Sequence, residues 1–346
     1  MVAGGMRAMV VRAFGGPERI VLEERERPAP RPGEALVRVA ACGVCHHDVL
    51  DRKGLLPSAR LPQILGHEIA GTVERVGEGV DALAPGDPVA VYVRTACGRC
   101  ADCLAGRQDR CRHSRLRGSG ADGGYAEYVL AAAHNLLPVP PATSLVDAAL
   151  AACPIGASLQ ALRAAAVGLG DVVLITGASG GLGLHQIQLA RLCGADVIAV
   201  TSSEAKVAAL RQAGAAEVVL APDLQFSARV WALTAKQGVS VVLDNVVSTT
   251  LRESLRSLGQ NGRLVVMGNV DVTPVPVDPG LLIGRRLHLM GSSVCTPRDL
   301  RAALDLLARG KVRSVIDSVY PFPEAAAAHR RLEERGVFGR VVLSGW

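Results

Sequence analysis

The stretch that decides the fold of this chain runs from residue 172 to residue 183 and reads VVLITGASGGLG. Its four apolar residues at 172–175 predict a buried strand, its glycines predict a tight turn, and a helix is expected through residues 185–192. This order is typical of dinucleotide binding, because N–H groups at a helix N-terminus attract a pyrophosphate that a Cβ would obstruct. The alternative is an ordinary tight turn between a strand and a helix.

Alternating strands and helices follow this turn. We expect strands at 197–200, 218–220, 239–243 and 262–267, and helices at 203–213 and 297–309. Such alternation predicts a parallel, doubly wound sheet, so the fold class is α/β. The first 150 or so residues instead predict short strands, at 35–40, 70–76, 88–93 and 125–130.

The composition excludes several classes of protein. Apolar residues make up 49% and charged residues 20% of the 346-residue chain, which is globular rather than disordered usage. The net charge is +6, but the basic residues are spread along the chain and interleaved with acids, so we expect no nucleic-acid partner. The first residues lack the apolar core of a signal peptide, and no apolar stretch is long enough to span a membrane. We therefore expect a cytoplasmic enzyme with a small-molecule substrate.

A run of four cysteines predicts a metal site. Cys97, Cys100, Cys103 and Cys111 have the spacing C-x2-C-x2-C-x7-C. This spacing lets four thiolates surround one tetrahedral Zn²⁺, which leaves no coordination position for a substrate. We therefore predict a structural zinc site in a short lobe. Disulfides are the alternative, but they need an oxidising compartment for which the chain shows no export signal.

The end of the second strand of the alternating region predicts which nicotinamide cofactor binds. NAD sites usually carry Asp or Glu there, because a carboxylate accepts hydrogen bonds from the ribose 2′-OH and repels a 2′-phosphate. This chain carries Thr201, Ser202 and Ser203, with Lys206 one helical turn further on. These groups can donate to a phosphate, so we predict NADP(H) in preference to NAD(H). The predicted contacts at the glycine turn are Gly177, Ser179, Gly180, Gly181, Leu182 and Gly183.

Three further candidates for metal ligands are scattered along the chain: Cys45, His67 and Cys153. Their spacing does not relate them to one another. Cys42 and Cys45 could also form a redox C-x-x-C pair, and Cys153 could be one more buried thiol.

The chain resembles the zinc-dependent medium-chain alcohol dehydrogenases along essentially its whole length. The resemblance rests on several segments in a fixed order, namely Gly43-Val44-Cys45-His46, Gly66-His67-Glu68, the four-cysteine run, Asp122-Gly123-Gly124-Tyr125-Ala126-Glu127-Tyr128, Cys153 and the glycine turn. It implies a GroES-like β-rich catalytic domain at 1–153 with its zinc lobe at 95–113, a Rossmann domain at 154–293, and a return to the catalytic domain at 294–346. It also implies a homodimer or homotetramer, with the strand near 287–290 as a plausible pairing edge.

The same resemblance implies roles for individual residues. Cys45, His67 and Cys153 would be the ligands of a catalytic zinc. Glu68 would be an alternate or outer ligand, and Asp48 would orient His67. Two thiolates, an imidazole and an open fourth position suit a zinc that binds a substrate oxygen directly.

The resemblance also implies two pyrophosphate contacts, His46 and Arg340, and it draws attention to one departure. Family members carry Ser or Thr two residues after the ligand cysteine to begin a proton relay, and this chain has His47 there, with Leu50 where a relay histidine often stands. His47 could donate the proton itself or be a structural histidine beside the metal.

This departure leaves two activities open. One is hydride transfer between NADP(H) and an alcohol and its aldehyde or ketone. The other is NADPH-dependent reduction of the C=C bond of an α,β-unsaturated carbonyl or thioester. Residues 176–181, 201–203 and Gly268-Asn269-Val270 look like those of NADPH-dependent acryloyl-CoA reductases, which adds the last three to the candidate cofactor residues. A non-catalytic NADPH-binding protein is the third possibility, and the retained ligand residues argue against it.

Overall fold

The computed structural model describes residues 4–268, 270–334 and 336–346. The chain folds as two compact units. The first unit comprises Met1–Gly156 and Val294–Trp346, and the second unit, inserted between these two parts, comprises Ala157–Ser293. Among the described helices, none has both the length and the apolar character needed to cross a membrane.

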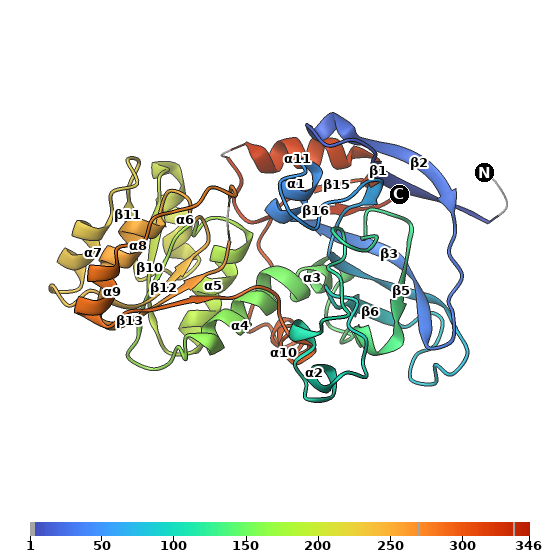
Figure 1. The fold of residues 1–346 in the computed structure, drawn as a ribbon, viewed down its shortest axis with the longest axis horizontal. Coiled ribbons are helices and arrows are strands. Elements are labelled where there is room, and N and C mark those ends of the chain that lie inside the picture. Colours follow the sequence, from blue (N-terminus) through green and yellow to red (C-terminus); the bar gives the residue numbers. More distant parts are fainter. Residues whose placement is uncertain (1–3, 269, 335) are drawn as a thin grey trace. The chain divides into compact units, whose positions relative to one another are not determined.

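The second unit is built on a six-stranded parallel sheet (Figure 1). The strands are β9 (Val172–Ile175), β10 (Asp196–Thr201), β11 (Glu217–Leu220), β12 (Val239–Asp244), β13 (Leu258–Val266) and β14 (His288–Gly291). They lie in the order β11-β10-β9-β12-β13-β14, which is the order of a doubly wound dinucleotide-binding sheet. The predicted α/β fold class is therefore confirmed.

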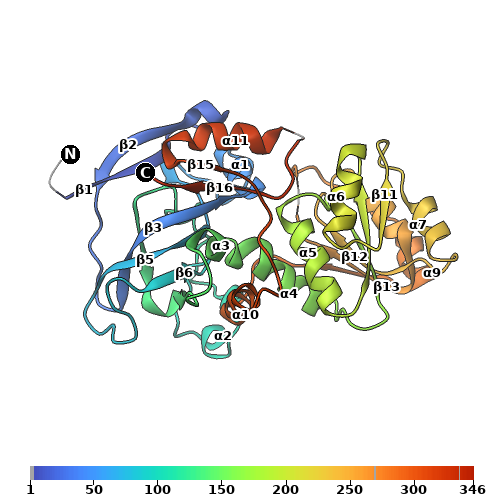
Figure 2. The ribbon, with the colours of Figure 1, turned by 180° about the vertical axis from the view of Figure 1, so that it is seen from behind.

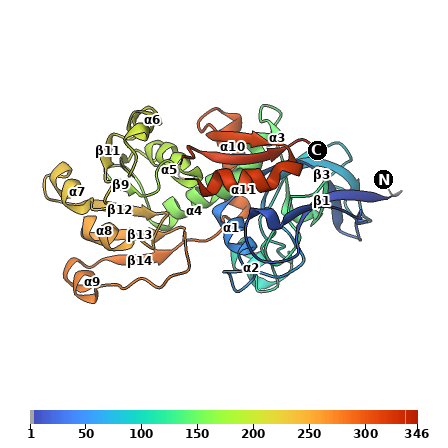
Figure 3. The same ribbon diagram turned by 90° about the horizontal axis from the view of Figure 1, so that it is seen from above.

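Helices cover both faces of this sheet. They are α4 (Gly156–Ala164), α5 (Gly181–Leu192), α6 (Val207–Gln212), α7 (Ser227–Leu233), α8 (Leu251–Ser257) and α9 (Pro279–Arg285). Figure 3 shows α5 on one side of the sheet and α8 on the other. Because a strand covered on both faces has no polar side, β9 is a continuous apolar run, and Val173, Leu174 and Ile175 are fully buried.

The first unit contains two sheets. One has the order β2-β1-β4, and in the other β15-β16-β3-β5-β6-β8 are neighbours while β7 also pairs with β3. The strands are β1 (Gly5–Val11), β2 (Ile20–Glu26), β3 (Glu34–Val44), β4 (Gln63–Ile64), β5 (Glu68–Val76), β6 (Pro88–Val91), β7 (Tyr128–Ala132), β8 (Leu136–Pro138), β15 (Ile316–Tyr320) and β16 (Arg340–Ser344). Since β16 pairs with β3, both parts of this unit build one sheet (Figure 2).

α-Helices of different lengths complete the first unit. They are α1 (His46–Arg52), α2 (Ala101–Leu104), α3 (Leu145–Ala149), α10 (Pro297–Ala308) and α11 (Ala325–Glu333). A capping box starts α10, because the Thr296 hydroxyl accepts the N–H of Asp299 while the Asp299 carboxylate accepts the N–H of Thr296. In all three views of the ribbon α11 lies beside α1.

The structure corrects several predicted boundaries. Tyr125 lies before β7 rather than in a strand, and it is fully buried. The helix expected at 203–213 is a 3₁₀ turn, Glu204–Lys206, followed by the shorter α6. The sequence does not predict β1, β2, β4, β8, β15 or β16. β4 and β8 are only two and three residues long, and β2 carries charged residues on an exposed face, so their apolar pattern is weak. β1 and β16 contain buried apolar runs that the sequence analysis did not recognise as strands.

The packing of α5 against the glycine turn gives a first prediction. A Cβ on Gly183 would lie 2.5 Å from the Cα of Ala178. Gly183→Ala should therefore push α5 away from the turn and lower the free energy of unfolding by about 1–3 kcal/mol. Gly284→Ala in α9 is the matched control, because nothing lies within 4 Å of its added methyl group. Urea unfolding measures both variants, and equal stabilities would contradict this account of the turn.

Candidate active site and metal centres

The four cysteines of the run converge in one lobe of the first unit. Cys103 lies in α2, and Cys100 is the residue directly before this helix. Cys97 precedes and Cys111 follows this segment in the sequence. The Sγ atoms of Cys97 and Cys103 are 3.9 Å apart, as are those of Cys100 and Cys111. Thiolates about 2.3 Å from a tetrahedral Zn²⁺ would be about 3.8 Å from one another. All four are free thiols and fit this geometry, and we call them the closed donor set.

Backbone N–H groups prepare the closed donor set for thiolates. Those of Arg99 and Cys100 donate to Cys97 and lower the pKa of its thiol to about 6. The N–H of Cys97 donates in turn to the Sγ of Cys111 at 3.5 Å. Since the thiolate is the form that binds metal, the local backbone favours an ion at this point.

A second donor set is assembled from segments far apart in the sequence. Cys45 directly follows β3, His67 and Glu68 stand at the start of β5, and Cys153 lies in a π-helical turn before α4. The register of β3 against β5 pairs Gly43 with Glu68, which draws the first three together. One donor atom from each of the four residues lies within 4.8 Å of the other three. We call these four residues the open donor set.

Asp48 orients the imidazole of the open donor set. Its Oδ1 lies 3.2 Å from Nδ1 of His67, and its Oδ2 accepts the N–H of Cys45 at 2.8 Å. The first contact directs Nε2 of His67 toward the other donors, as expected of a metal-ligating histidine. Asp48 is fully buried, so its carboxylate is held by these protein contacts rather than by solvent.

The two thiols of the open donor set are hydrogen-bonded to one another. The hydrogen bond from Cys153 lowers the pKa of Cys45 well below the ordinary thiol value, and the same bond raises the pKa of Cys153. Since a metal ion binds thiolates, its binding would displace the protons that these two thiols carry. The donor chemistry therefore fits zinc.

Arg340 balances the charge of this site. It is buried, it comes from β16, and it donates to Oε1 of Glu68 at 2.6 Å. Burial nevertheless raises the pKa of Glu68 to about 7. The Oε2 atom of Glu68 is buried and has no hydrogen-bond partner in the described part of the chain. This oxygen is therefore a further donor that a metal could use.

His47 lies beside the open donor set. Its ring meets that of His67 edge-on, with centroids 5.8 Å apart, and its Nε2 is 3.2 Å from Oδ2 of Asp51. Asp51 also accepts a hydrogen bond from Ser119 at 2.8 Å, and the hydroxyls of Ser119 and Ser58 are 2.7 Å apart. The sequence analysis missed these three partners, although the i, i+4 spacing of His47 and Asp51 on α1 could have indicated one of them.

The glycine turn of the second unit forms an anion cradle. Gly177 has a φ of +56°, which favours glycine, and it accepts the N–H of Gly180 at 3.0 Å. Gly180 caps α5 without a side chain, so the N–H groups of the first turn, at Gly181 and Leu182, are left for a ligand. Apart from the Gly177 carbonyl oxygen at 3.3 Å, a Cβ on Gly180 would occupy open space. The turn therefore fits a pyrophosphate.

The end of β10 lies beside this cradle. Nζ of Lys206 donates to Oγ of Ser179 at 3.3 Å, which joins the 3₁₀ turn after β10 to the glycine turn. Thr201 ends β10, and its hydroxyl accepts the N–H of Ser203 at 3.2 Å, while Ser202 between them is exposed. The segment after β10 thus carries hydroxyls and the Lys206 ammonium, together with the exposed Glu204 of the same 3₁₀ turn.

The other predicted cofactor residues fall in different places. Gly268 and Val270 belong to the loop after β13, and Asn269 lies outside the described residues. His46, the first residue of α1, and Arg340 belong to the first unit, with the open donor set.

A buried carboxylate that the sequence analysis missed holds the cradle. Asp244, at the end of β12, accepts hydrogen bonds from Thr176 at 2.7 Å, Thr250 at 2.6 Å and Ser254 at 2.7 Å. Because Thr176 directly precedes Gly177, Asp244 fixes the point at which the chain enters the turn. Its position at the end of a predicted strand was the available signal.

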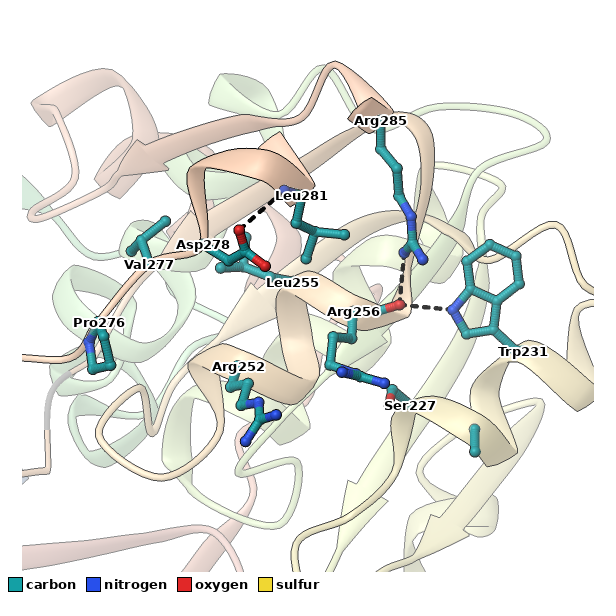
Figure 4. A pocket seen from close by; sticks show the side chains of 11 residues that line it. Ser227, Trp231, Arg252, Leu255, Arg256, Pro276, Val277, Asp278, Leu281 and Arg285 are labelled. Carbon is teal, nitrogen blue, oxygen red and sulfur yellow. Dashed lines mark hydrogen bonds between the residues drawn. The ribbon is translucent and has the colours of Figure 1, made fainter. Parts of the chain in front are cut away.

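A pocket of about 700 Å³ lies between α7, α8 and α9 of the second unit (Figure 4). Its lining includes Trp231, with the guanidinium of Arg285 4.8 Å from the ring centroid, and none of the predicted site residues. The predicted cofactor and metal sites are therefore not in this pocket.

Two family models match the chain. One describes an alcohol dehydrogenase GroES-like domain and matches residues 31–141, and the other describes a zinc-binding dehydrogenase and matches residues 181–309. The acryloyl-coenzyme A reductase of Metallosphaera sedula is 34% identical over 98% of this chain and 100% of its own length. This chain belongs to the zinc-binding alcohol dehydrogenase family.

Other members of the family agree with this assignment. An alcohol dehydrogenase of Geobacillus stearothermophilus is 35% identical over 98% of this chain and 99% of its own length. The crystal structure of AibC matches with a TM-score of 0.92 at 44% identity and covers 100% of this chain and 97% of that one. The predicted resemblance is confirmed, and the protein is an oxidoreductase of the alcohol dehydrogenase family.

The two donor sets should lose zinc independently. Cys111→Ser should reduce the metal content from two zinc ions to one and lower the midpoint of thermal unfolding by more than about 5 °C, because a structural zinc contributes folding free energy. Cys153→Ser should also bind one zinc, keep its unfolding midpoint within about 2 °C, and lose at least about a thousandfold in kcat/KM. Metal analysis and thermal unfolding check both results.

Cys193→Ser is the control for these variants, since this half-buried thiol belongs to neither donor set. It should keep two zinc ions and full activity. Two zinc ions in Cys153→Ser would refute the assignment of the open donor set.

Proposed function

We propose that this protein transfers a hydride between NADP(H) and an alcohol and its aldehyde or ketone, with a catalytic zinc. The observation that carries the proposal is the open donor set, in which two thiols and an oriented imidazole converge. Two thiols and one imidazole supply three ligands, so a zinc ion bound by them would keep a fourth coordination position for a substrate oxygen. The four thiols of the closed donor set would leave no such position. The anion cradle of the second unit supports a dinucleotide as the hydride carrier.

Each residue of the open donor set has a proposed task. Cys45, His67 and Cys153 would bind the metal, Asp48 would hold the imidazole, and Glu68 would serve as an alternate donor. When bound, Zn²⁺ would act as a Lewis acid on the substrate oxygen, and the nicotinamide would supply or accept the hydride. Asp48, His67 and Glu68 are buried, whereas Cys45 and Cys153 are half-buried. The imidazole and the two carboxylates are therefore shielded from bulk water, which strengthens the electrostatic interactions among them.

His47 is the proposed proton carrier. It replaces the hydroxyl residue at which family members begin their relay, it contacts the ring of His67, and its Nε2 is close to Asp51. Ser119 donates to Asp51, whose carboxylate lies 3.2 Å from Nε2 of His47 and would position the imidazole. A structural role for His47 is the alternative.

Cofactor preference gives the next prediction. Lys206 and the hydroxyls at the end of β10 support NADP(H), so KM should be lower for NADPH than for NADH. Lys206→Ala should raise KM for NADPH about tenfold, which corresponds to about 1.4 kcal/mol, and leave KM for NADH nearly unchanged. Lys236→Ala, on the loop after α7, is the control and should change neither value. A lower KM for NADH in the unchanged protein would exclude the proposed preference.

A second candidate function is reduction of the C=C bond of an α,β-unsaturated carbonyl or thioester. His47, in place of the relay hydroxyl, favours it, because such a reaction does not need a relay from an alcohol. A relative named acryloyl-coenzyme A reductase also supports it.

A substrate panel separates the two functions. Saturated aldehydes and ketones would be compared with enones and enoyl thioesters, with NADPH consumption measured and products identified. The first proposal predicts at least about tenfold higher kcat/KM on C=O substrates, because the open donor set can bind their oxygen directly. Turnover confined to C=C substrates would establish the second function instead.

We also propose a homo-oligomer, either a dimer or a tetramer. β14 is the outer strand of the six-stranded sheet, and its Leu289 is 40% exposed. An outer strand with an exposed apolar side chain is a surface that a second copy could cover.

A further inference from the structure

A buried arginine anchors a line of polar side chains beside the open donor set. Arg52, the last residue of α1, has no exposed side-chain surface. Its Nε donates to the carbonyl of Gly15 at 3.1 Å, and its NH2 group donates to both carboxylate oxygens of Glu333 at 3.0 and 3.1 Å. Its NH1 group lies 3.2 Å from Nδ1 of His329. A buried charge needs partners of this kind, so the guanidinium is fixed in position.

The contact with Arg52 determines the hydrogen-bonding state of His329. An arginine can only donate, so Nδ1 of His329 must accept, and the ring proton must be on Nε2. Burial lowers the pKa of His329 to about 4, which keeps the ring neutral at ordinary pH. Nε2 lies 3.0 Å from the hydroxyl oxygen of Tyr125. His329 therefore donates to Tyr125, and the hydroxyl proton of Tyr125 is left for another acceptor.

Asp48 is that acceptor. The hydroxyl of Tyr125 is 3.5 Å from Oδ2 of Asp48, the oxygen that also accepts the N–H of Cys45. Oδ1 of the same carboxylate faces Nδ1 of His67. Hydrogen bonds thus run in one direction from Arg52 to Asp48, and they leave Oδ1 as an acceptor for His67.

The ring of Tyr125 also contacts the backbone next to His67. A Cβ on Gly66 would lie 2.5 Å from Cδ1 of Tyr125, so the ring is packed directly against this glycine. The N–H of Tyr125 donates to the carbonyl of Leu65 at 3.0 Å. Tyr125 therefore constrains the segment of His67 through the backbone and through Asp48.

We infer that Arg52, His329 and Tyr125 are positioning residues for His67, and that they act through Asp48. Each of the three donates a hydrogen bond to the next group on the way to Asp48, which leaves Oδ1 of Asp48 as the acceptor for Nδ1 of His67. This orientation presents Nε2 of His67 to a metal. The expected consequence is tighter zinc binding at the open donor set. The inference rests on the proposed function only in taking this set as a zinc site.

The first test removes one hydroxyl and keeps the ring. Tyr125→Phe should raise the zinc dissociation constant of the open donor set about tenfold in chelator competition, because outer hydrogen-bond partners of a ligating histidine tune metal affinity. The closed donor set should keep its affinity. In the cobalt-substituted protein, the absorption bands of the open donor set should shift, which a loss of stability alone would not cause.

The control is another buried tyrosine of the first unit. Tyr92 is fully buried, and its hydroxyl donates to the carbonyl of Cys295 at 2.8 Å, with no link to Asp48. Tyr92→Phe should leave both zinc affinities and the cobalt spectrum unchanged. An equal loss of zinc affinity in Tyr92→Phe and Tyr125→Phe, or no loss in Tyr125→Phe, would overturn the inference.

A second variant tests whether the residues act in one line. His329→Leu should raise the zinc dissociation constant of the open donor set to a similar extent. The double variant, His329→Leu with Tyr125→Phe, should have a dissociation constant no higher than the higher of the two single variants. If the fold-changes of the two single variants multiply in the double variant, the inference is overturned. If His329→Leu does not fold, the result for Tyr125→Phe decides the inference alone. Failure of the proposed function is distinguishable, because the unchanged protein would then bind one zinc ion rather than two.

Discussion

The register of β3 against β5 is the constraint on which the candidate site depends. Pairing of Gly43 with Glu68 sets Cys45, two residues after Gly43, beside His67, one residue before Glu68. A shift of one residue would turn the side chains of a whole strand to the opposite face and separate these donors. On its other edge β3 pairs with β16, with Gly43 opposite Val342, which brings Arg340 to the same end of the strand. Strand β3 therefore positions both the candidate metal ligands and the arginine that balances their charge.

Burial of charge is the cost of this arrangement. Asp48, Glu68 and Arg340 are all buried, and an isolated charge in such a place would be strongly destabilising. The site avoids that penalty through pairs, since Arg340 meets Glu68 and Asp48 meets His67. A divalent ion would add positive charge to a set whose thiols release protons. The positive charge of the metal ion would therefore balance the negative charge of the thiolates.

The sequence predicts the second unit better than the first for a physical reason. Strands such as β9 are buried on both faces and form continuous apolar runs, and the glycine turn is local, so both are recognisable without tertiary information. The closed donor set is predictable for the same reason, because its ligands lie within fifteen residues. In the first unit, β2 carries charged residues along its length, and β16 pairs with β3 from the other end of the chain, so local sequence gives less information about these strands.

The open donor set needed a family resemblance, because the spacing of Cys45, His67 and Cys153 carries no signal. The buried line behind Asp48 could not be predicted at all. Arg52 and His329 are 277 residues apart in sequence, and Tyr125 and His329 are 204 apart. Arginine and histidine on helices α1 and α11 resemble ordinary surface residues until the fold buries them.

Pairing of β16 with β3 has a consequence for the order in which the protein is made. The second unit is encoded without interruption and needs no strand from the rest of the chain for its sheet. The first unit differs, because β3 in its larger sheet pairs with β16, which is synthesised about 300 residues later. Until then the edge of β3 that β16 covers lacks its partner. The larger sheet of the first unit, and with it the contact of Arg340 with Glu68, is therefore complete only when the last strand of the chain has been made.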